Sequence, residues 1–181
     1  MGKGLALRGP CCIPLYTLRD SSHRVASLRG PHMQPWIVVG SADNFEILRE
    51  RGFDVCAFKE SRRKQSGEMR PGDRIVFYLT GIVQFGGMVE VTGEMFEDIS
   101  DIGLRSAGKP GEDYPFRIAT KPVAIPDVGD YIEVREITDL LDKTRKLGPK
   151  KLGMAFRGNL HKITDADYAA IEKLLGERVP A

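Results

Sequence analysis

Two strand-like segments, separated by a cationic turn between residues 55 and 81, constrain the fold more than any other feature of this sequence. The first segment is apolar and ends near Phe58. A Pro-Gly-Asp turn at 71–73 then begins a second segment, which is rich in β-branched and aromatic residues. This succession predicts two strands of a β-sheet with a basic connection between them.

The second segment alternates in the way that is typical of a strand. Ile75, Phe77 and Leu79 fall on one face, so Tyr78 and Thr80 are expected on the opposite face. Gly81 then allows a tight reversal into the next strand.

The connection between these two segments carries many cations and few acids. Its basic residues are Lys59, Arg62, Arg63, Lys64, Arg70 and Arg74, against Glu60, Glu68 and Asp73. Such a run indicates an anionic partner, and a merely solvated turn is the alternative.

The overall charge of the chain does not decide between an anionic partner and a solvated turn. Residues 1–32 hold five basic groups and one acid, and removing these from the totals of 27 and 25 leaves 22 basic and 24 acidic residues. Any affinity for nucleic acid after residue 32 therefore has to come from a local patch.

The chain divides near Met33. Residues 1–32 show neither helical nor strand periodicity and are predicted to be an N-terminal extension, either disordered or mis-annotated. An upstream start codon wrongly chosen is favoured over a disordered basic arm or a processed leader, and Gly-Pro-His-Met at 30–33 would also suit a cloning remnant. Residues 33–181 are predicted to form one domain.

Within that domain the pattern predicts a β-rich fold with a few helices. A strand at 36–39 leads into a helix capped by Ser41 or Asp43. Further strands are expected at 53–58, 75–80, 84–92, 114–123, 131–134 and 154–156, with helices at 137–141 and 164–175. Gly86 and Gly87 suggest a bulge, a bend or a close approach to the backbone. The long loop 97–115 is of a length that is often functional.

Several common chemistries lack their usual signatures. The sequence has no GxxxxGK loop, no GxGxxG helix start and no GxSxG elbow. Its cysteines and histidines are too scattered for a metal site, and no cofactor is expected. Cys56 and His161 could form a thiolate and base pair, but a buried cysteine is the favoured interpretation. Three cysteines and no apolar run of membrane-spanning length predict a cytoplasmic protein.

Aromatic residues near the predicted strand ends lie close in sequence to cations. The aromatics are Trp36, Phe58, Tyr78, Phe85, Tyr114, Phe116 and Phe156, and the cations are Lys59, Arg62, Arg63, Arg117 and Arg157. Aromatic faces stack on bases while Arg and Lys hold phosphates. Most of these aromatics could equally be core residues. Core is favoured for Phe77 and Phe85, and a pocket for Trp36, Phe58 and Tyr114.

A set of short motifs carries a resemblance to a known family. They are Trp36-Ile37-Val38-Val39-Gly40-Ser41, Phe58-Lys59-Glu60 with 62–65, Met69-Arg70-Pro71-Gly72-Asp73, 78–81, 96–98, Asp113-Tyr114-Pro115-Phe116-Arg117 and Phe156-Arg157-Gly158-Asn159-Leu160. With these motifs in this order, the chain from about residue 35 to residue 175 resembles an EVE domain, a member of the PUA-like superfamily related to YTH domains. The resemblance implies an α+β fold, a curved mixed β-sheet or pseudo-barrel of five to six strands flanked by helices. It also implies a concave pocket for a modified nucleobase.

The leading hypothesis is a non-enzymatic module that binds RNA or DNA and reads a modified base, with no catalytic residue. Ligand-binding residues would be Trp36, Ser41, Asn44, Phe58, Lys59, Tyr78, Thr80, Tyr114 and Phe116. Phosphate-binding residues would be Arg62, Arg63, Lys64, Arg117 and Arg157. One alternative is an ASCH-like hydrolase acting on nucleotides or nucleic acid, with Lys59 as base and Glu60 as acid. Another is an interaction module whose basic turn meets an acidic protein.

Overall fold

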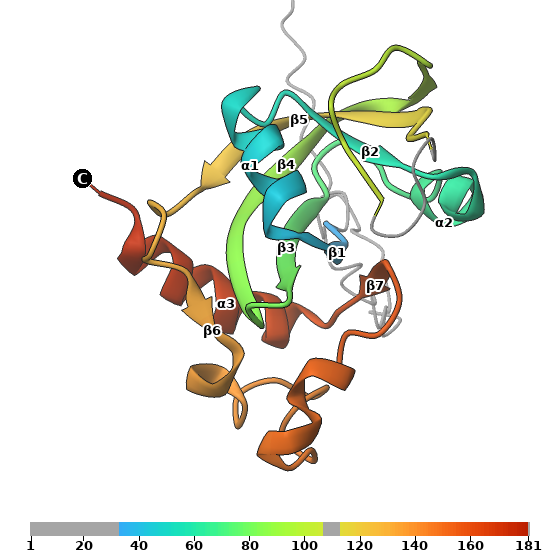
Figure 1. Ribbon diagram of the computed structural model, residues 1–181. Helices are drawn as coiled ribbons and strands as arrows, with labels where there is room; N and C mark the ends of the chain where they lie inside the picture. Colours follow the sequence, from blue (N-terminus) through green and yellow to red (C-terminus); the bar gives the residue numbers. More distant parts are fainter. Residues whose placement is uncertain (1–32, 107–112, 181) are drawn as a thin grey trace, which may run out of the picture. The chain divides into compact units, whose positions relative to one another are not determined.

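The computed structural model describes residues 33–106 and 113–180 (Figure 1). The prediction made for residues 1–32 lies outside the described part of the chain. The described residues form a curled mixed sheet with helices packed on both of its faces, so the predicted α+β fold class is confirmed.

The sheet runs in the order β2-β5-β4-β3-β1-β7. Its strands are β1 (Pro35–Ser41), β2 (Val55–Phe58), β3 (Arg74–Thr80), β4 (Gln84–Glu97), β5 (Phe116–Ala124) and β7 (Leu160–Lys162), and the short β6 (Ile132–Glu133) pairs with β4. The β1–β3 pair is parallel, whereas the other pairs of this sheet are antiparallel. Parallel pairing needs a long connection, and helix α1 together with β2 and the cationic segment supplies it.

Two helices begin at the caps that the sequence indicates. Helix α1 (Ala42–Glu50) starts at Ser41, whose side chain accepts a hydrogen bond from the Asn44 amide. Helix α3 (Asp165–Arg178) starts at Thr164, whose hydroxyl accepts from the Asp167 amide. Both of these helices were predicted.

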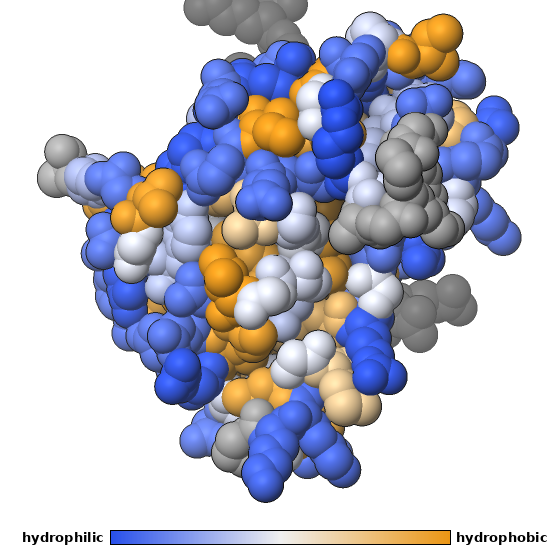
Figure 2. Space-filling model, in the orientation of Figure 1, coloured by the Kyte–Doolittle hydropathy of each residue, from blue (hydrophilic) through white to orange (hydrophobic). Residues whose placement is uncertain are grey.

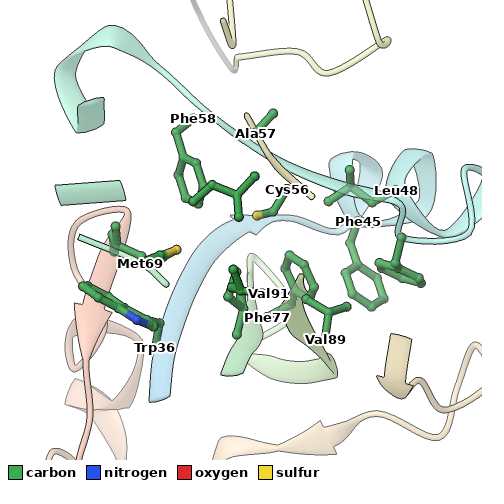
Figure 3. Close-up of a cluster of buried hydrophobic side chains, with 14 of the residues drawn as sticks. Trp36, Phe45, Leu48, Cys56, Ala57, Phe58, Met69, Phe77, Val89 and Val91 are labelled. Atoms are coloured by element: carbon green, nitrogen blue, oxygen red, sulfur yellow. The ribbon is translucent and has the colours of Figure 1, made fainter. Parts of the chain in front are cut away.

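The helices bury both faces of the central strands. Ile75, Phe77 and Leu79 face a core that includes Phe45 of α1 (Figure 3). Val76 and Tyr78 face a second core, which holds Tyr168, Ile171 and Leu175 of α3. The predicted alternation of β3 is therefore correct. Tyr78, which was assigned to ligand binding, is buried in the second core, where its ring centre lies 4.8 Å from that of Phe156.

The glycine pair in β4 forms the predicted irregularity. The β3–β4 register shifts between Phe77 and Tyr78, opposite Gly86. A Cβ on Gly86 would lie 2.7 Å from Leu79 Cδ1 and 3.0 Å from the Phe45 ring. Only glycine lets the backbone approach the first core this closely.

Three local predictions were wrong. The cationic segment is helical, as the 3-10 helix Glu60–Arg62 followed by α2 (Arg63–Ser66). The helix expected at 137–141 is instead the end of a 3-10 helix, Val134–Ile137, followed by a turn. The strand expected at 154–156 is instead the end of another 3-10 helix, η3 (Pro149–Met154), and the turn after it. The last strand is instead Leu160–Lys162. Short apolar runs do not distinguish these structures, because their periodicity is not resolved over so few residues.

Within the described part of the chain, no helix is long and apolar enough to span a membrane.

Candidate functional site

A cavity of about 350 Å³ opens where the two ends of the curled sheet approach each other. One wall comes from β2, the first strand in the sheet order. Another comes from the end of β1 and from Gly158 and Asn159, which precede β7, the last strand. β7 pairs only with Trp36–Val38, whereas β1 continues beside β3 to Ser41, so the end of β1 borders the opening. Figure 2 shows apolar surface at the centre of the face that carries α1, set among hydrophilic side chains.

The floor of the cavity is apolar and belongs to the first core. It is formed by Phe45 and Leu48 of α1, Cys56 of β2, and Phe77 and Leu79 of β3. Figure 3 labels all of these except Leu79, and shows their side chains gathered between α1, β2 and the central strands. A flat apolar group could therefore be buried against this floor.

The rim combines an aromatic ring with cations. Lys59 donates a hydrogen bond to Ser106 Oγ over 2.6 Å, and its Nζ lies 5.3 Å from the centre of the Tyr114 ring. The Tyr114 hydroxyl donates to the Arg105 carbonyl at 3.2 Å. Arg62, from the 3-10 helix after β2, also lines the cavity. The arrangement places positive charge and a π-face at the same opening.

Three predicted polar contacts line the cavity but are already engaged within the protein. Ser41 caps α1, and the Thr80 hydroxyl donates to the Gly40 carbonyl at 3.1 Å. The Asn44 side chain donates to the Arg105 carbonyl at 2.7 Å and accepts from the Arg105 amide at 2.9 Å. Asn44 therefore fixes the segment 104–106 as a wall, and its amide is not free to read the edge of a ligand.

Of the nine predicted ligand-binding residues, the structure brings six to the cavity: Ser41, Asn44, Phe58, Lys59, Thr80 and Tyr114. The other three do not line it. Trp36 is buried beside Asp73, Tyr78 faces the second core, and Phe116 lies beneath Arg63, whose guanidinium carbon is 5.1 Å from the ring centre. Side chains on adjacent strands were assigned to one site from sequence, but the pleat sends some of them into the interior.

The predicted phosphate-binding residues also separate. Arg62 lines the cavity, and Arg63 and Lys64 are exposed on α2 beside it. Arg157 is exposed and immediately precedes Gly158 of the cavity wall. Arg117 is different, because its guanidinium is buried and donates to Asp98 at 2.6 Å and to Ser100 Oγ at 3.0 Å. We therefore remove Arg117 from the site.

The groups proposed for catalysis are not assembled in the cavity. Glu60 does not line it, and its side chain is 73% exposed at 3.9 Å from Arg63. Burial raises the pKa of the Cys56 thiol to about 12, so Cys56 is protonated at neutral pH. Among the described residues no group of three or more His, Cys, Asp or Glu side chains is placed to hold a metal ion.

Sequence reasoning missed part of the lining. Leu104, Arg105 and Ser106 belong to the long loop 97–115, from which only Tyr114 was chosen. Gly40, Gly158 and Asn159 were quoted only within family motifs. Gly158 has a φ of +106°, a conformation that favours glycine, so the glycine itself was the only signal in the sequence at this position.

Comparison with known proteins places this geometry in a family. A UPF0310 protein of Pyrococcus abyssi is 26% identical over 151 residues, which cover 79% of this chain and all of that protein. A hypothetical protein from Leishmania major has a similar fold, with a TM-score of 0.55 and 16% identity over 81% of this chain and 96% of its own. The YTH domain of the Zygosaccharomyces rouxii MRB1 protein, solved with N6-methyladenosine RNA, also has a TM-score of 0.55, with 14% identity over 92% of this chain and 95% of its own. The family model described as EVE domain matches residues 34–174, and the chain belongs to that family.

Proposed function

We propose that this protein binds nucleic acid and holds one modified base in the cavity above Phe77 and Leu79, without catalysing a reaction. The observation that carries the proposal is an apolar floor under a rim formed by Tyr114, Lys59 and Arg62. Bases taken out of a stack are gripped in this way, by apolar and aromatic faces with phosphates held by cations. A volume of about 350 Å³ lies within the range of about 300–1,000 Å³ that is usual for small-ligand sites.

Structural relatives support a nucleic-acid partner. Two of the similar solved structures are YTH domains in complex with RNA, and one of these RNAs contains N6-methyladenosine. These two structures share the fold but are only 14% and 8% identical in sequence to this chain. The base that this chain would select therefore depends on the residues that line its own cavity.

A modified base would be distinguished by how its extra group fits the floor. An added methyl would contact the Phe45, Leu79 and Leu104 side chains, which are buried and apolar. A methyl-sized difference in an apolar pocket is worth about 1–3 kcal/mol. Arg105 occupies both the donor and the acceptor of the Asn44 side-chain amide. Hydrogen bonds to the base edge are therefore assigned to the Ser41 hydroxyl, which accepts one bond but keeps its proton to donate, and to the Thr80 hydroxyl, which donates to Gly40 but can still accept.

The hydrolase alternative has less support from the geometry. Glu60 is outside the cavity, and Lys59 contacts Ser106 and the Tyr114 ring. An acid and a base within reach of one bound group would be required. We therefore assign Lys59 to binding.

The test is a binding panel. Fluorescence anisotropy is measured with RNA and DNA oligonucleotides that differ only in one central base, unmodified or carrying a methyl or hydroxymethyl group on cytosine or adenine. We expect at least one modified oligonucleotide to bind about tenfold more tightly than its unmodified counterpart. Equal affinity for the modified and unmodified oligonucleotide in every pair would refute base reading. Turnover of any oligonucleotide would favour the hydrolase alternative.

A further inference from the structure

A second basic stretch of the described residues lies outside the cavity, in the segment that leads to β7. Residues 143–164 contain seven Lys or Arg residues and no Asp or Glu, whereas 24 acidic residues occur elsewhere after Met33. The seven are Lys143, Arg145, Lys146, Lys150, Lys151, Arg157 and Lys162. We call residues 143–157, which include η3 (Pro149–Met154), the basic lobe.

The cations of this lobe point to solvent and lack local compensation. Arg145, Lys146, Lys150, Lys151 and Arg157 are all exposed. Arg145 pairs with Asp142 at 2.6 Å, but no carboxylate of the described residues lies within ion-pair distance of the other four. Like charges held close together repel, so such a surface is more stable when an anion is bound to it.

The lobe adjoins the cavity through the chain itself. Arg157 ends the lobe, and the next two residues, Gly158 and Asn159, line the cavity. On the other flank, the side-chain amide of Gln65 in α2 donates a hydrogen bond to the Leu160 carbonyl at 3.0 Å. This bond holds α2, which carries Arg63 and Lys64, against β7. In Figure 1, β7 lies between α2 and the orange segment that contains η3. Cations therefore border the cavity wall from both sides.

A second observation places the lobe and the cavity rim near the same side chain. His161 lies in β7 just after the cavity wall, and the position of a Cβ on Gly158 is 3.7 Å from its Nε2. Burial lowers the pKa of His161, and the positive charges of Lys143 and Arg62 lower it further. Lys143 belongs to the lobe and Arg62 to the cavity rim, so both cationic surfaces act on the same side chain.

We propose that the basic lobe is a phosphate-binding surface for the single strand that carries the bound base, so that the protein contacts the strand on both sides of the cavity. This rests on the proposed function and adds a second binding surface to it, outside the cavity that holds the base. An anionic strand suits the surface because its charges repeat along its length and can meet successive cations. Each contact that neutralises a phosphate makes the affinity fall more steeply with salt.

The test uses the full chain and the exposed Lys150 and Lys151. The double variant Lys150→Gln/Lys151→Gln is compared with Lys121→Gln/Lys173→Gln, which removes the same charge from exposed lysines on β5 and α3. The probes are the best oligonucleotide of the base panel at a length of about twelve nucleotides, and the same modified base in a fragment of about three nucleotides. Affinity is measured between about 0.05 and 0.2 M salt.

For the longer probe, we expect the lobe variant to bind about fivefold or more weakly at low salt. The slope of log K against log salt should be reduced by about 1.4, that is by about 0.7 for each of the two lost phosphate contacts on a single strand. The short probe should bind the lobe variant and the wild type alike, and the control variant should match the wild type with both. An unchanged slope and affinity would overturn the role of the lobe, while preference for the modified base would still uphold the proposed function. Loss of binding to an acidic polypeptide such as poly-glutamate, with nucleic-acid binding intact, would assign the lobe to a protein partner and overturn the proposal.

Discussion

The indole nitrogen of Trp36 donates a hydrogen bond to Oδ2 of Asp73 over 3.0 Å, in the interior of the domain. The same carboxylate accepts from the Arg70 amide at 3.0 Å and from the Gln34 amide at 2.9 Å. Asp73 thereby joins the start of β1 to the turn that begins β3. Trp36 and the Pro-Gly-Asp turn therefore have a structural role, and neither lines the cavity.

Substitution of Asp73 should destabilise the fold. Asp73→Ala removes the acceptor of three hydrogen bonds, of which the one from the Trp36 indole is buried, and we expect a loss of about 3 kcal/mol in the free energy of unfolding. Asp73→Asn keeps one acceptor oxygen and should cost less. Urea unfolding followed by tryptophan fluorescence measures both, with the exposed Asp127→Ala as control. Equal stability of Asp73→Ala and wild type would contradict the conclusion that Asp73 holds the start of β1 against the turn that begins β3.

Tyr114 should contribute to binding through its ring. In Tyr114→Ala the stacking face is lost, and base–aromatic stacking is worth about 1–3 kcal/mol, so affinity for the preferred oligonucleotide should fall about tenfold. Tyr114→Phe keeps the ring and loses only the bond to Arg105, so it should bind nearly normally. Phe96→Ala removes an exposed aromatic outside the cavity and serves as the control. If Tyr114→Ala and Phe96→Ala behaved alike, the ring would not be part of the site.

Asn44 should act by holding the cavity wall. Asn44→Ala removes both hydrogen bonds to the Arg105 backbone, so the Arg105 amide should exchange its hydrogen faster and ligand affinity should fall several-fold. Asn44→Asp retains the acceptor for the Arg105 amide and should give intermediate exchange. Hydrogen–deuterium exchange read out at Arg105 checks this directly. Reduced affinity without faster exchange would mean that Asn44 contacts the ligand itself.

Gly86 should tolerate no side chain. The Cβ of Gly86→Ala would overlap Leu79 and the Phe45 ring, both of which line the cavity floor, and overpacking of this kind costs about 1–3 kcal/mol. Gly93→Ala is the matched control in the same strand, because its Cβ would make an ordinary contact with Ala119 at 3.4 Å. Thermal unfolding should separate the two variants. A melting temperature for Gly86→Ala equal to that of Gly93→Ala would show that the floor can move aside.

Cys56 should be unreactive in the folded protein. With a pKa of about 12 against an ordinary 9.0, its thiolate fraction at pH 8 is about a thousandfold lower than in the unfolded chain. Peptide mapping after iodoacetamide treatment, with and without urea, distinguishes Cys56 from Cys11 and Cys12. Because the folded state holds this proton more tightly, its contribution to stability is complete below pH 9 and is lost as the pH rises toward 12. Rapid native alkylation of Cys56 would contradict this.

Local sequence patterns determined much of the architecture. Ser41 and Thr164 marked both long helices, because an N-cap needs only a side-chain oxygen next to the first amides. The alternation of residues 75–80 gave the two faces of β3, and Gly86 marked the bulge. The family resemblance followed from the order of short motifs, and the fold followed from the family.

The tertiary structure alone decided which of these residues meet at the cavity. Trp36 and Tyr78 were assigned to a pocket because aromatics near strand ends suit one, but Asp73 and α3 bury them. Arg117 of β5 was assigned to phosphate binding because it is a cation beside aromatic residues, but its guanidinium pairs with Asp98, a contact that no spacing in the sequence reveals. Burial depends on what packs against each face, and these neighbours come from distant parts of the chain. The sequence therefore specified the strands, the caps and the family, whereas the curling of the sheet selected Lys59, Arg62 and Tyr114 as the rim of the site.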